Sequence, residues 1–326
     1  MKRGWAALAL LGATSVEAQP RVLVLREAGA QHAPASGEGL SDDVLRAARA
    51  AREATLLRAR GGAEAALREA RQRFLGSEFL AAAAALEAAI EAHIDVLIAG
   101  DRGLLLSLLH WAGACRRLGG EGDAARARFA RAVLIAPEEP LPTATFQPEV
   151  EAEFEAVRRD VSALSGESQT LRSVPSGARI VLDGRDEGAT PLTLRVTPGV
   201  HHLRLEHTGF RPFTGAWRIE PGGPSEREVV LGEASSEALR GQVEAPDGLV
   251  TRADAATLAR IAGLYRVSAV RVLGRDGGTD RWPTPSPTQG PALWPWWVGA
   301  GVLGVGLGVG LFFYFRPEPE VVFVAP

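Results

Sequence analysis

The sequence predicts a multidomain protein in which α-helical repeats are followed by a small β-sandwich, a short α/β segment and one transmembrane helix. Three observations lead to this fold class. Residues 63–164 are rich in Ala, Leu and Arg with helical spacing, residues 170–232 alternate apolar and polar side chains with the period of a strand, and residues 293–315 carry no charge.

Composition limits the classes of function. Of the 326 residues, 46% are hydrophobic, which is typical of folded domains. The formal net charge is −3, so the chain lacks the basic excess of a nucleic-acid-binding protein. Cys115 is the sole cysteine. The chain therefore forms no intramolecular disulfide and no multi-cysteine metal site.

The N-terminal residues 1–18 have the pattern of a secretory signal peptide. Lys2 and Arg3 precede an apolar run, and Val16-Glu17-Ala18 carries the small residues of a cleavage site. We expect cleavage after Ala18 and export of the chain. An uncleaved N-terminal anchor and a buried helix are the two alternatives.

Residues 19–62 are expected to form a strand-helix segment. The run RVLVL at 21–25 suits a buried strand, and Ser41 suits the N-cap of a helix that reaches about residue 57 and is closed by the Gly61-Gly62 pair. Asp42 and Asp43 then favour the positive end of the helix dipole. Adjacent residues on a helix do not face each other, so we do not interpret them as a catalytic pair.

The helical segment 63–164 contains an internal near-repeat with the spacing of tetratricopeptide repeats, in which small residues let two helices approach and an aromatic residue fills the seam. The second copy contains Gly113, Ala125, Phe129, Ala132 and Pro137. The first copy contains Ala82, Leu86 and Ala89, with Phe79 ahead of them and no closing proline. The copies are more widely spaced than usual, so the link IDVLIAGDRG must be an insertion or a longer helix.

Two repeats bury too little surface to be stable alone, so a further element must cover the end of the array. The stripe Val150, Phe154, Val157 and Val161 predicts a capping helix over about 148–164. The same helical region contains residues that we interpret as packing residues and not as ligands: His93, His110, Trp111 and Cys115.

After a predicted polar hinge at 165–169, the period changes from helical to two. Ala178, Ile180 and Leu182 alternate up to the Asp183-Gly184 pair, which predicts a hairpin turn, and Pro198-Gly199 suits a type II turn. Further alternating pairs extend to residue 231. Five or six short strands at this spacing predict a small sandwich.

The motifs PSGA, VLDG, GATP, PGVHHLRL and TGF resemble those of the PEGA family, with Ser176 in place of the name-giving glutamate. The matching residues are Pro175, Gly177, Ala178, Asp183, Gly184, Gly188, Thr190, Pro191, Pro198, Gly199, Gly209 and Phe210. The resemblance implies an envelope-exposed β module, often found beside tetratricopeptide repeats and a membrane anchor, with no enzymatic activity attached to these residues. Glycines, prolines and alternating apolar residues specify turns and core, and we assign them a structural role.

Three histidines in this module do not predict a metal site. Neighbouring residues on a strand point to opposite faces, which separates His201 from His202, and six residues at ~3.3 Å each place His207 about 20 Å from His201. We therefore expect no bound metal and no other cofactor.

Residues 239–281 combine a helix signal with the apolar run VSAVRVL. Together with the strand at 21–25 and the helix near the N-terminus they could complete one α/β layer into which the repeats and the β module are inserted. The alternative is a separate helix-strand appendage.

The C-terminal part predicts a membrane anchor. The Pro-rich linker 282–292 leads into the apolar run 293–315, which is long enough for a hydrocarbon core of ~30 Å and has Trp and Tyr at its ends. Arg316 and the export signal place the tail 316–326 in the cytoplasm. Gly304 and Gly308 have the spacing of a helix-dimer face, which could support a homodimer, whereas the G-x-G-x-x-G match at Gly299 lacks the strand-turn-helix context of a dinucleotide site.

These features predict a non-enzymatic, single-pass protein of the bacterial inner membrane with most of the chain in the periplasm. Its helical repeats would bind an unknown protein partner, and the PEGA module would act as a spacer or secondary contact. The alternative is that the module binds a cell-wall polymer, peptidoglycan or polysaccharide. An enzyme would instead require a deep polar pocket between the α/β pieces.

Overall fold

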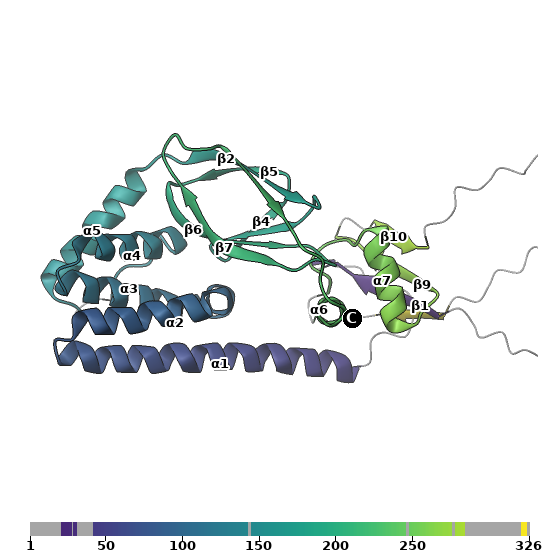
Figure 1. Cartoon of the computed structure of the whole chain (residues 1–326), viewed down its shortest axis with the longest axis horizontal. Coiled ribbons are helices and arrows are strands. Elements are labelled where there is room, and N and C mark those ends of the chain that lie inside the picture. The colour runs from purple at the N-terminus through teal and green to yellow at the C-terminus, as the bar shows by residue number, and fades with distance from the viewer. Residues whose placement is uncertain are drawn as a thin grey trace, which may run out of the picture.

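The computed structural model describes residues 21–27, 29–30, 42–142, 145–245, 248–275, 278–283 and 321–324. Three parts follow one another in Figure 1: a layer of helices, a β-sandwich above one end of this layer, and a small α/β unit beside the sandwich. The long helix α1 runs along the base of the helical layer.

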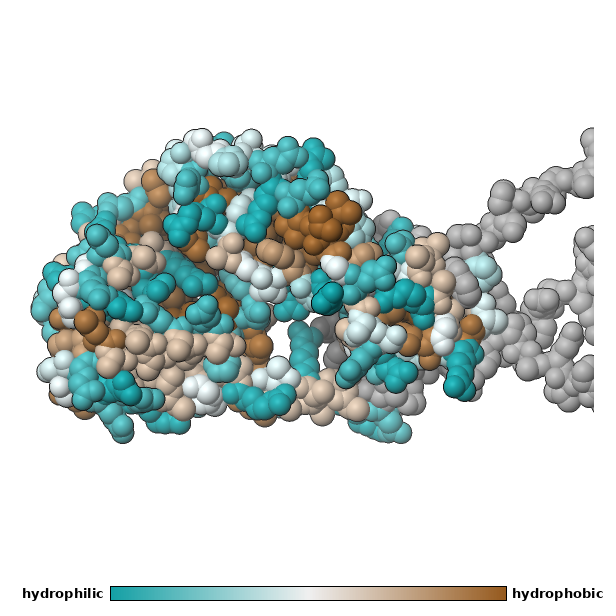
Figure 2. Space-filling model, in the orientation of Figure 1, coloured by the Kyte–Doolittle hydropathy of each residue, from teal (hydrophilic) through white to brown (hydrophobic). Residues whose placement is uncertain are grey.

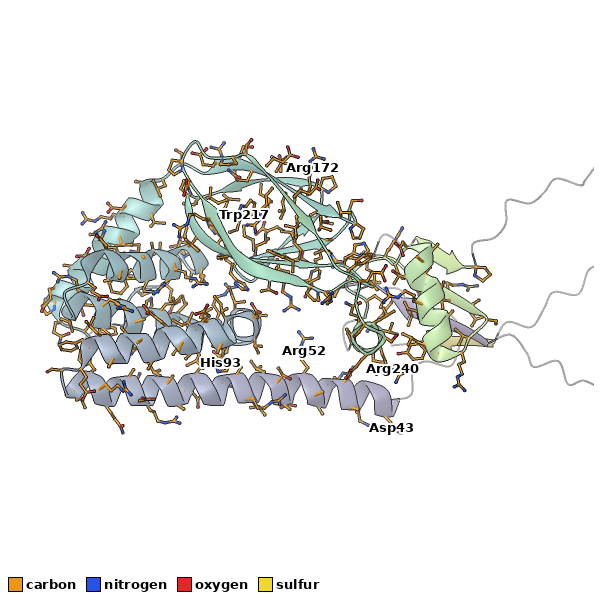
Figure 3. All side chains as sticks on the ribbon, viewed as in Figure 1. Asp43, Arg52, His93, Arg172, Trp217 and Arg240 are labelled. Carbon is orange, nitrogen blue, oxygen red and sulfur yellow. The ribbon has the colours of Figure 1, made fainter. Side chains whose placement is uncertain are left out.

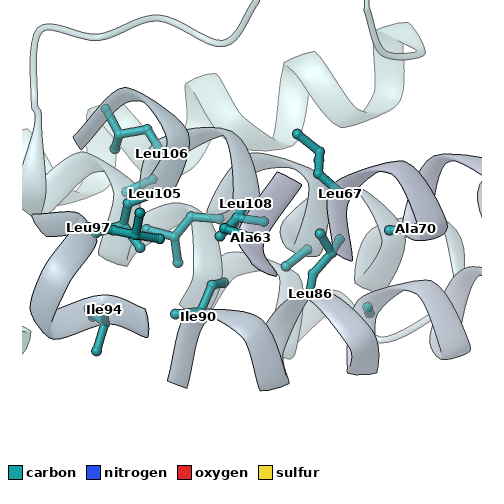
Figure 4. Packing of buried hydrophobic residues seen from close by; sticks show 14 of the residues in the cluster. Ala63, Leu67, Ala70, Leu86, Ile90, Ile94, Leu97, Leu105, Leu106 and Leu108 are labelled. Atoms are coloured by element: carbon teal, nitrogen blue, oxygen red, sulfur yellow. The ribbon is translucent and has the colours of Figure 1, made fainter. Parts of the chain in front are cut away.

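The helical layer is an array in which each helix packs on the next along the chain. Its core is formed by Ala and Leu side chains that α1, α2 and α3 direct at one another, with Leu86, Leu97 and Leu105 fully buried (Figure 4). The bounds of the helices are α1 Asp42–Leu75, α2 Phe79–Gly100, α3 Arg102–Leu118, α4 Gly122–Ile135 and α5 Pro148–Ala163.

The Gly61-Gly62 pair does not end the first helix, and this prediction was wrong. Helix α1 continues through both glycines to Leu75. A Cβ on Gly62 would lie 2.6 Å from Nε2 of His93 on α2, whereas the space around Gly61 is open. Gly62 therefore allows α1 and α2 to approach each other, and packing on α2 outweighs the low helix propensity of two glycines.

Helix α5 occurs where the sequence predicts it, and α2 and α3 lie within the segment that is predicted to be helical. Helix α2 runs through IDVLIAG to Gly100, so the wide spacing between the two repeat copies reflects a longer helix. Asp101 caps α3 by accepting the N–H of Leu104 at 3.1 Å. The predicted cap is helix α5, which packs Val150, Phe154 and Val157 against α4 and the following loop.

The segment from 167 to 230, called the β module below, is a sandwich of two sheets with strand orders β5-β2-β8 and β4-β3-β6-β7. Trp217 lies between the sheets and Arg172 lies on the outer face (Figure 3). The strands are β2 Glu167–Val174, β3 Arg179–Leu182, β4 Arg185–Ala189, β5 Leu192–Val196, β6 Gly199–Glu206, β7 Phe213–Ile219 and β8 Glu226–Val230.

The predicted hinge at 165–169 is shorter than expected, because β2 begins at Glu167. This strand was missed because two of its three buried side chains, Gln169 and Ser173, are polar and only Leu171 gives an apolar signal. Pro198-Gly199 also differs from a regular type II turn. Gly199 has a φ of 147°, and the pair lies where the chain crosses from one sheet to the other.

The strand at 21–25 joins the segment after the β module, in agreement with one of the two alternatives left open by the sequence. Strand β1 pairs in parallel with β9, and Leu23, Leu25 and Val272 pack with helices α6 and α7 in one core. The helix predicted at 41–57 is instead part of the helical layer. The elements of this unit, called the α/β unit below, are β1 Arg21–Arg26, α6 Ser236–Val243, α7 Ala255–Tyr265, β9 Ala269–Leu273, β10 Thr279–Trp282 and β11 Val321–Val324.

The predicted signal peptide 1–18, the transmembrane helix 293–315 and the glycines Gly304 and Gly308 lie outside the described residues. None of the helices in the described ranges is long and apolar enough for a bilayer span. Strand β11 pairs in parallel with β1. This pairing places 321–324 on the same side as β1, whereas the predicted topology separates the two strands by a membrane.

Candidate functional site

The Asp183-Gly184 turn joins β3 to β4 as the sequence predicts. The two residues have φ angles of 48° and 79°, and positive φ at both central positions defines the type I′ turn that matches the twist of a hairpin. The Asp183 carboxylate also accepts the backbone N–H of His202 at 2.8 Å and lies 2.6 Å from Nδ1 of His201. A single carboxylate therefore fixes the turn to β6.

His201 is buried between two acceptors. Its Nδ1 faces the Asp183 carboxylate, and its Nε2 lies 2.7 Å from the carbonyl oxygen of Thr197. Burial lowers the pKa of His201, but the hydrogen bond to Asp183, the charge of Asp183 and the Thr197 carbonyl raise it, with the net result that the pKa lies above its usual value. The doubly protonated ring is the form that satisfies both acceptors.

Thr190 joins the first and third motifs of the β module. Its carbonyl accepts the N–H of Gly177 at 2.7 Å, its N–H donates to the carbonyl of Ala178 at 2.9 Å, and its Oγ1 accepts the N–H of Ala178 at 3.0 Å. Its hydroxyl also contacts that of Ser173. The motif residues Pro175, Gly177, Ala178, Thr190 and Pro191 therefore lie together at one end of the sandwich.

Two motif glycines lie against the helical layer. A Cβ on Gly184 would lie 2.6 Å from the backbone oxygen of Ile98 in α2, and a Cβ on Gly199 would lie 2.5 Å from Cδ1 of Leu134 in α4. Between them, Nε2 of the buried His202 lies 2.9 Å from Oδ1 of Asp95 on α2. These turns therefore form an interface as well as reversing the chain.

The TGF motif contacts the α/β unit in the same manner. The Thr208 hydroxyl donates to the carbonyl of Thr251 at 2.8 Å and accepts the Thr251 N–H at 3.1 Å, and both threonines are buried. Gly209 donates its N–H to Oε1 of Gln242 at 2.8 Å, and the Gln242 amide donates to the carbonyl of Phe210 at 2.8 Å. A Cβ on Gly209 would meet Thr257 of α7 at 2.4 Å. The β module is thus held at both ends.

A cleft of about 690 Å³ separates the helical layer from the β module. Helices α2 and α4 form one wall, and residues 214–216 of β7 with His202 of β6 form the other. Figure 2 shows teal side chains where the helical layer meets the β module. The volume is within the range of ligand-binding clefts, ~300–1,000 Å³.

The charges in the cleft are arranged in two groups. Glu87, Glu91 and Asp95 follow one another at four-residue intervals on α2 and therefore share a face, and Arg128 and Arg131 line the cleft from α4. Glu87 pairs with Arg128 at 2.8 Å and with Arg116 at 2.6 Å. Burial opposes the ionised form of Glu87, but these arginines outweigh it and keep the pKa of Glu87 below its usual value.

The group of charged residues in the cleft was not identified from the sequence, although the spacing of the three acidic residues on α2 is visible there. The sequence could not show that α4 and β6 face the same helix surface. The three histidines of the module do not come together: His201 faces Asp183, His202 faces Asp95, and Nδ1 of His207 lies 2.9 Å from the carbonyl of Thr208. Within the described part of the chain, no group of three His, Cys, Asp or Glu side chains could hold a metal ion.

The residues of the repeat motif lie in the core of the helical layer. A Cβ on Gly113 of α3 would lie 2.4 Å from Cε1 of Phe129 on α4, so the small residue makes room for the aromatic ring. Pro137 follows directly after the C-cap residue of α4, Ala136. The remaining small and apolar motif residues are buried: Ala82, Leu86, Ala89, Ala125 and Ala132.

The other residues of the helical layer that the sequence analysis named also pack against neighbouring side chains. The ring of His110 lies edge-on to Phe154, and burial lowers the pKa of His110 to about 4. Trp111 packs edge-on against Phe74 and Phe146. Cys115 is a buried free thiol whose pKa burial raises to about 12.

The architecture defines a multidomain protein in which a β-sandwich joins a helical array to an α/β unit. The PEGA domain model matches residues 168–233, from β2 to just beyond β8. The β module is therefore a PEGA domain. No curated protein and no solved structure matches the chain.

Proposed function

We propose that this chain is a non-enzymatic scaffold of the cell envelope that binds a protein partner in the cleft between its helical layer and its PEGA domain. The observation that carries the proposal is the composition of this cleft. Its walls come from two different parts of the chain, α2 and α4 on one side and β6 and β7 on the other. The PEGA domain is then half of the binding site, and its contacts with α2 and α4 at Gly184 and Gly199 hold the two walls in a fixed geometry.

The envelope location is part of the proposal. A PEGA domain indicates an extracellular or envelope-associated module. We propose that residues 1–18 export the chain, that 293–315 anchor it in the bacterial inner membrane, and that the described parts lie in the periplasm. A homodimer through Gly304 and Gly308 is compatible with this arrangement.

Site-directed photo-crosslinking in the native envelope tests the scaffold function. A photoreactive residue at Ala88, which is exposed in the cleft, should capture a discrete partner that mass spectrometry identifies. The same residue at the exposed Glu149 of α5 serves as the control. Absence of a product specific to Ala88 would reject the proposed site.

The outer face of sheet β5-β2-β8 supports a second candidate, binding of a cell-wall polymer. This face points away from the helices in Figure 1 and exposes Val174 and Val230, which are register partners on β2 and β8 with exposed fractions of 49% and 73%. The full-length protein in detergent should then co-sediment with purified cell walls, and the double variant Val174→Asp/Val230→Asp should remain in solution. Failure of the unsubstituted protein to pellet would rule out this function.

A further inference from the structure

We propose that the cleft binds the carboxyl-terminal end of an extended peptide, with the terminal carboxylate on Arg131, a cationic side chain near Glu91 and the peptide backbone along the free edge of β7. This inference rests on the proposed scaffold function and specifies the chemistry of the partner.

Arg131 is the first observation. Its Nε atom is buried without a hydrogen-bond partner, and within the described ranges its side chain forms no ion pair. Burial, followed by the charge of Arg128, lowers the pKa of Arg131, and Asp183 and Glu91 only partly oppose this effect. A desolvated cation without a partner costs free energy, whereas a carboxylate can accept two parallel hydrogen bonds from a guanidinium. Arg131 therefore has the chemistry of an anion-binding residue.

Glu91 is the second observation. On the same face of α2, Glu87 is paired with Arg116 and Arg128, whereas Asp95 lies beside Nε2 of His202, a ring that burial keeps neutral by lowering its pKa. Glu91 is exposed in the cleft and forms no ion pair with any residue that the structure describes, including Arg131. Two opposite charges thus line one cleft without forming an ion pair with each other, and Glu91 acts on Arg131 only at longer range. A ligand that carries both an anion and a cation would complement them.

Strand β7 is the third observation. It is the last strand of sheet β4-β3-β6-β7, and 214–216 of this edge line the cleft. An edge strand directs alternate N–H and C=O groups outward, where an extended peptide can pair with them. Thr214, Gly215 and Ala216 are small, so a second backbone can approach closely. A free carboxyl terminus, an extended backbone and a basic side chain therefore fit the three features together.

Fluorescence anisotropy with the full-length protein in detergent tests the inference. The probe is a pool of hexapeptides with an N-terminal fluorophore, one arginine at any of the first five positions, and a free carboxyl terminus. We expect the pool to bind, and the same pool with an amidated terminus to bind at least ten-fold more weakly. A pool with citrulline in place of arginine should bind about five-fold more weakly.

Two variants locate the peptide. Arg131→Gln should weaken binding of the free-acid pool at least ten-fold and should leave the weak binding of the amidated pool unchanged. Glu91→Gln should remove the preference for arginine over citrulline. Arg159→Gln and Glu149→Gln on α5 are the matched controls and should bind like the unsubstituted protein.

A misfolded variant would be recognised by its thermal midpoint. Arg131 has no partner to lose, so Arg131→Gln should unfold at an unchanged or higher temperature. Ala216→Trp fills the cleft from the β7 side without changing any charge, and it should abolish binding of the free-acid pool.

Absence of binding by the unsubstituted protein, equal binding of free-acid and amidated pools, or full binding by folded Arg131→Gln would each overturn the inference. A partner crosslinked at Ala88 together with any of these results would leave the scaffold function intact and refute only the peptide chemistry.

Discussion

The contact between Gly113 and Phe129 gives the sharpest test of how the helical layer is packed. A Cβ on Gly113 would lie 2.4, 2.6 and 2.9 Å from three ring atoms of Phe129, a residue with no exposed surface. In an open helix, Gly→Ala stabilises by about 1 kcal/mol. Overpacking in a core costs about 1–3 kcal/mol, because the rigid ring cannot move without displacing its neighbours. Gly113→Ala should therefore lower the free energy of unfolding by up to about 2 kcal/mol.

A double-mutant cycle separates overpacking from other effects. Phe129→Leu alone leaves a cavity and should cost about 1 kcal/mol, but it also removes the ring atoms that Gly113→Ala would meet. The pair should then be less destabilised than the sum of the single variants by ~1 kcal/mol. Gly61→Ala on α1, where the space is open, is the control and should be stabilising.

Urea unfolding followed by circular dichroism at 222 nm measures these free energies in the full-length protein. A stabilising Gly113→Ala, or strictly additive effects of the two substitutions, would show that α3 and α4 do not pack through this contact. The tetratricopeptide-like interpretation of the second repeat copy would then lose its main support.

Three further predictions concern the β module and the termini. The folded pKa of His201 lies above the unfolded value of ~6.5, so its protonation stabilises the fold below about pH 6.5, and this stabilisation is lost as pH rises through the folded pKa. The difference in thermal midpoint between the unsubstituted protein and His201→Gln should therefore shrink from pH 6 to pH 9. A constant difference would contradict the raised pKa. Thr208→Val removes both hydrogen bonds between its hydroxyl and the Thr251 backbone and should lower the free energy of unfolding by about 1–3 kcal/mol. Thr170→Val, at an exposed hydroxyl pair, should lower it by less than ~0.5 kcal/mol. Equal losses would show that the contact with the α/β unit is not specific. A reporter fused after Pro326 should be active in the cytoplasm, because 23 uncharged residues at 293–315 suffice for a span; periplasmic activity would instead support the pairing of β11 with β1.

The sequence predicted the elements whose patterns are local. The hairpin at Asp183-Gly184 follows from a two-residue preference, and the cap helix α5 follows from an apolar stripe. The errors have a common cause. The glycine pair at 61–62 was interpreted from helix propensity alone, but His93, thirty-one residues away, decides the conformation there. Tertiary contact overrode a local signal that is weak, about 1 kcal/mol for each glycine.

The candidate site could not be predicted for a related reason. Its charged residues come from α2 and α4 and its other wall from β6 and β7, so the site depends on how the β module docks on the helices. The spacing of Glu87, Glu91 and Asp95 was visible, but a row of acidic residues on a helix is usually a solvated face. Only the structure shows that arginines of α3 and α4 neutralise Glu87, that Asp95 faces the neutral ring of His202, and that Glu91 forms no ion pair with any described residue.

The PEGA motif itself shows how a structural signature can position a functional site. A glycine at a turn is required for its positive φ, and the sequence pattern indicates no more than that. In this chain Gly184 and Gly199, with φ angles of 79° and 147°, also lie within reach of Ile98 and Leu134, where a side chain of any size would separate the module from the helical layer. The same residues therefore shape the turns and set the distance between β7 and α2. Because that distance fixes the width of the cleft, residues that the motif assigns to the fold of the module also determine whether its edge strand can meet a partner.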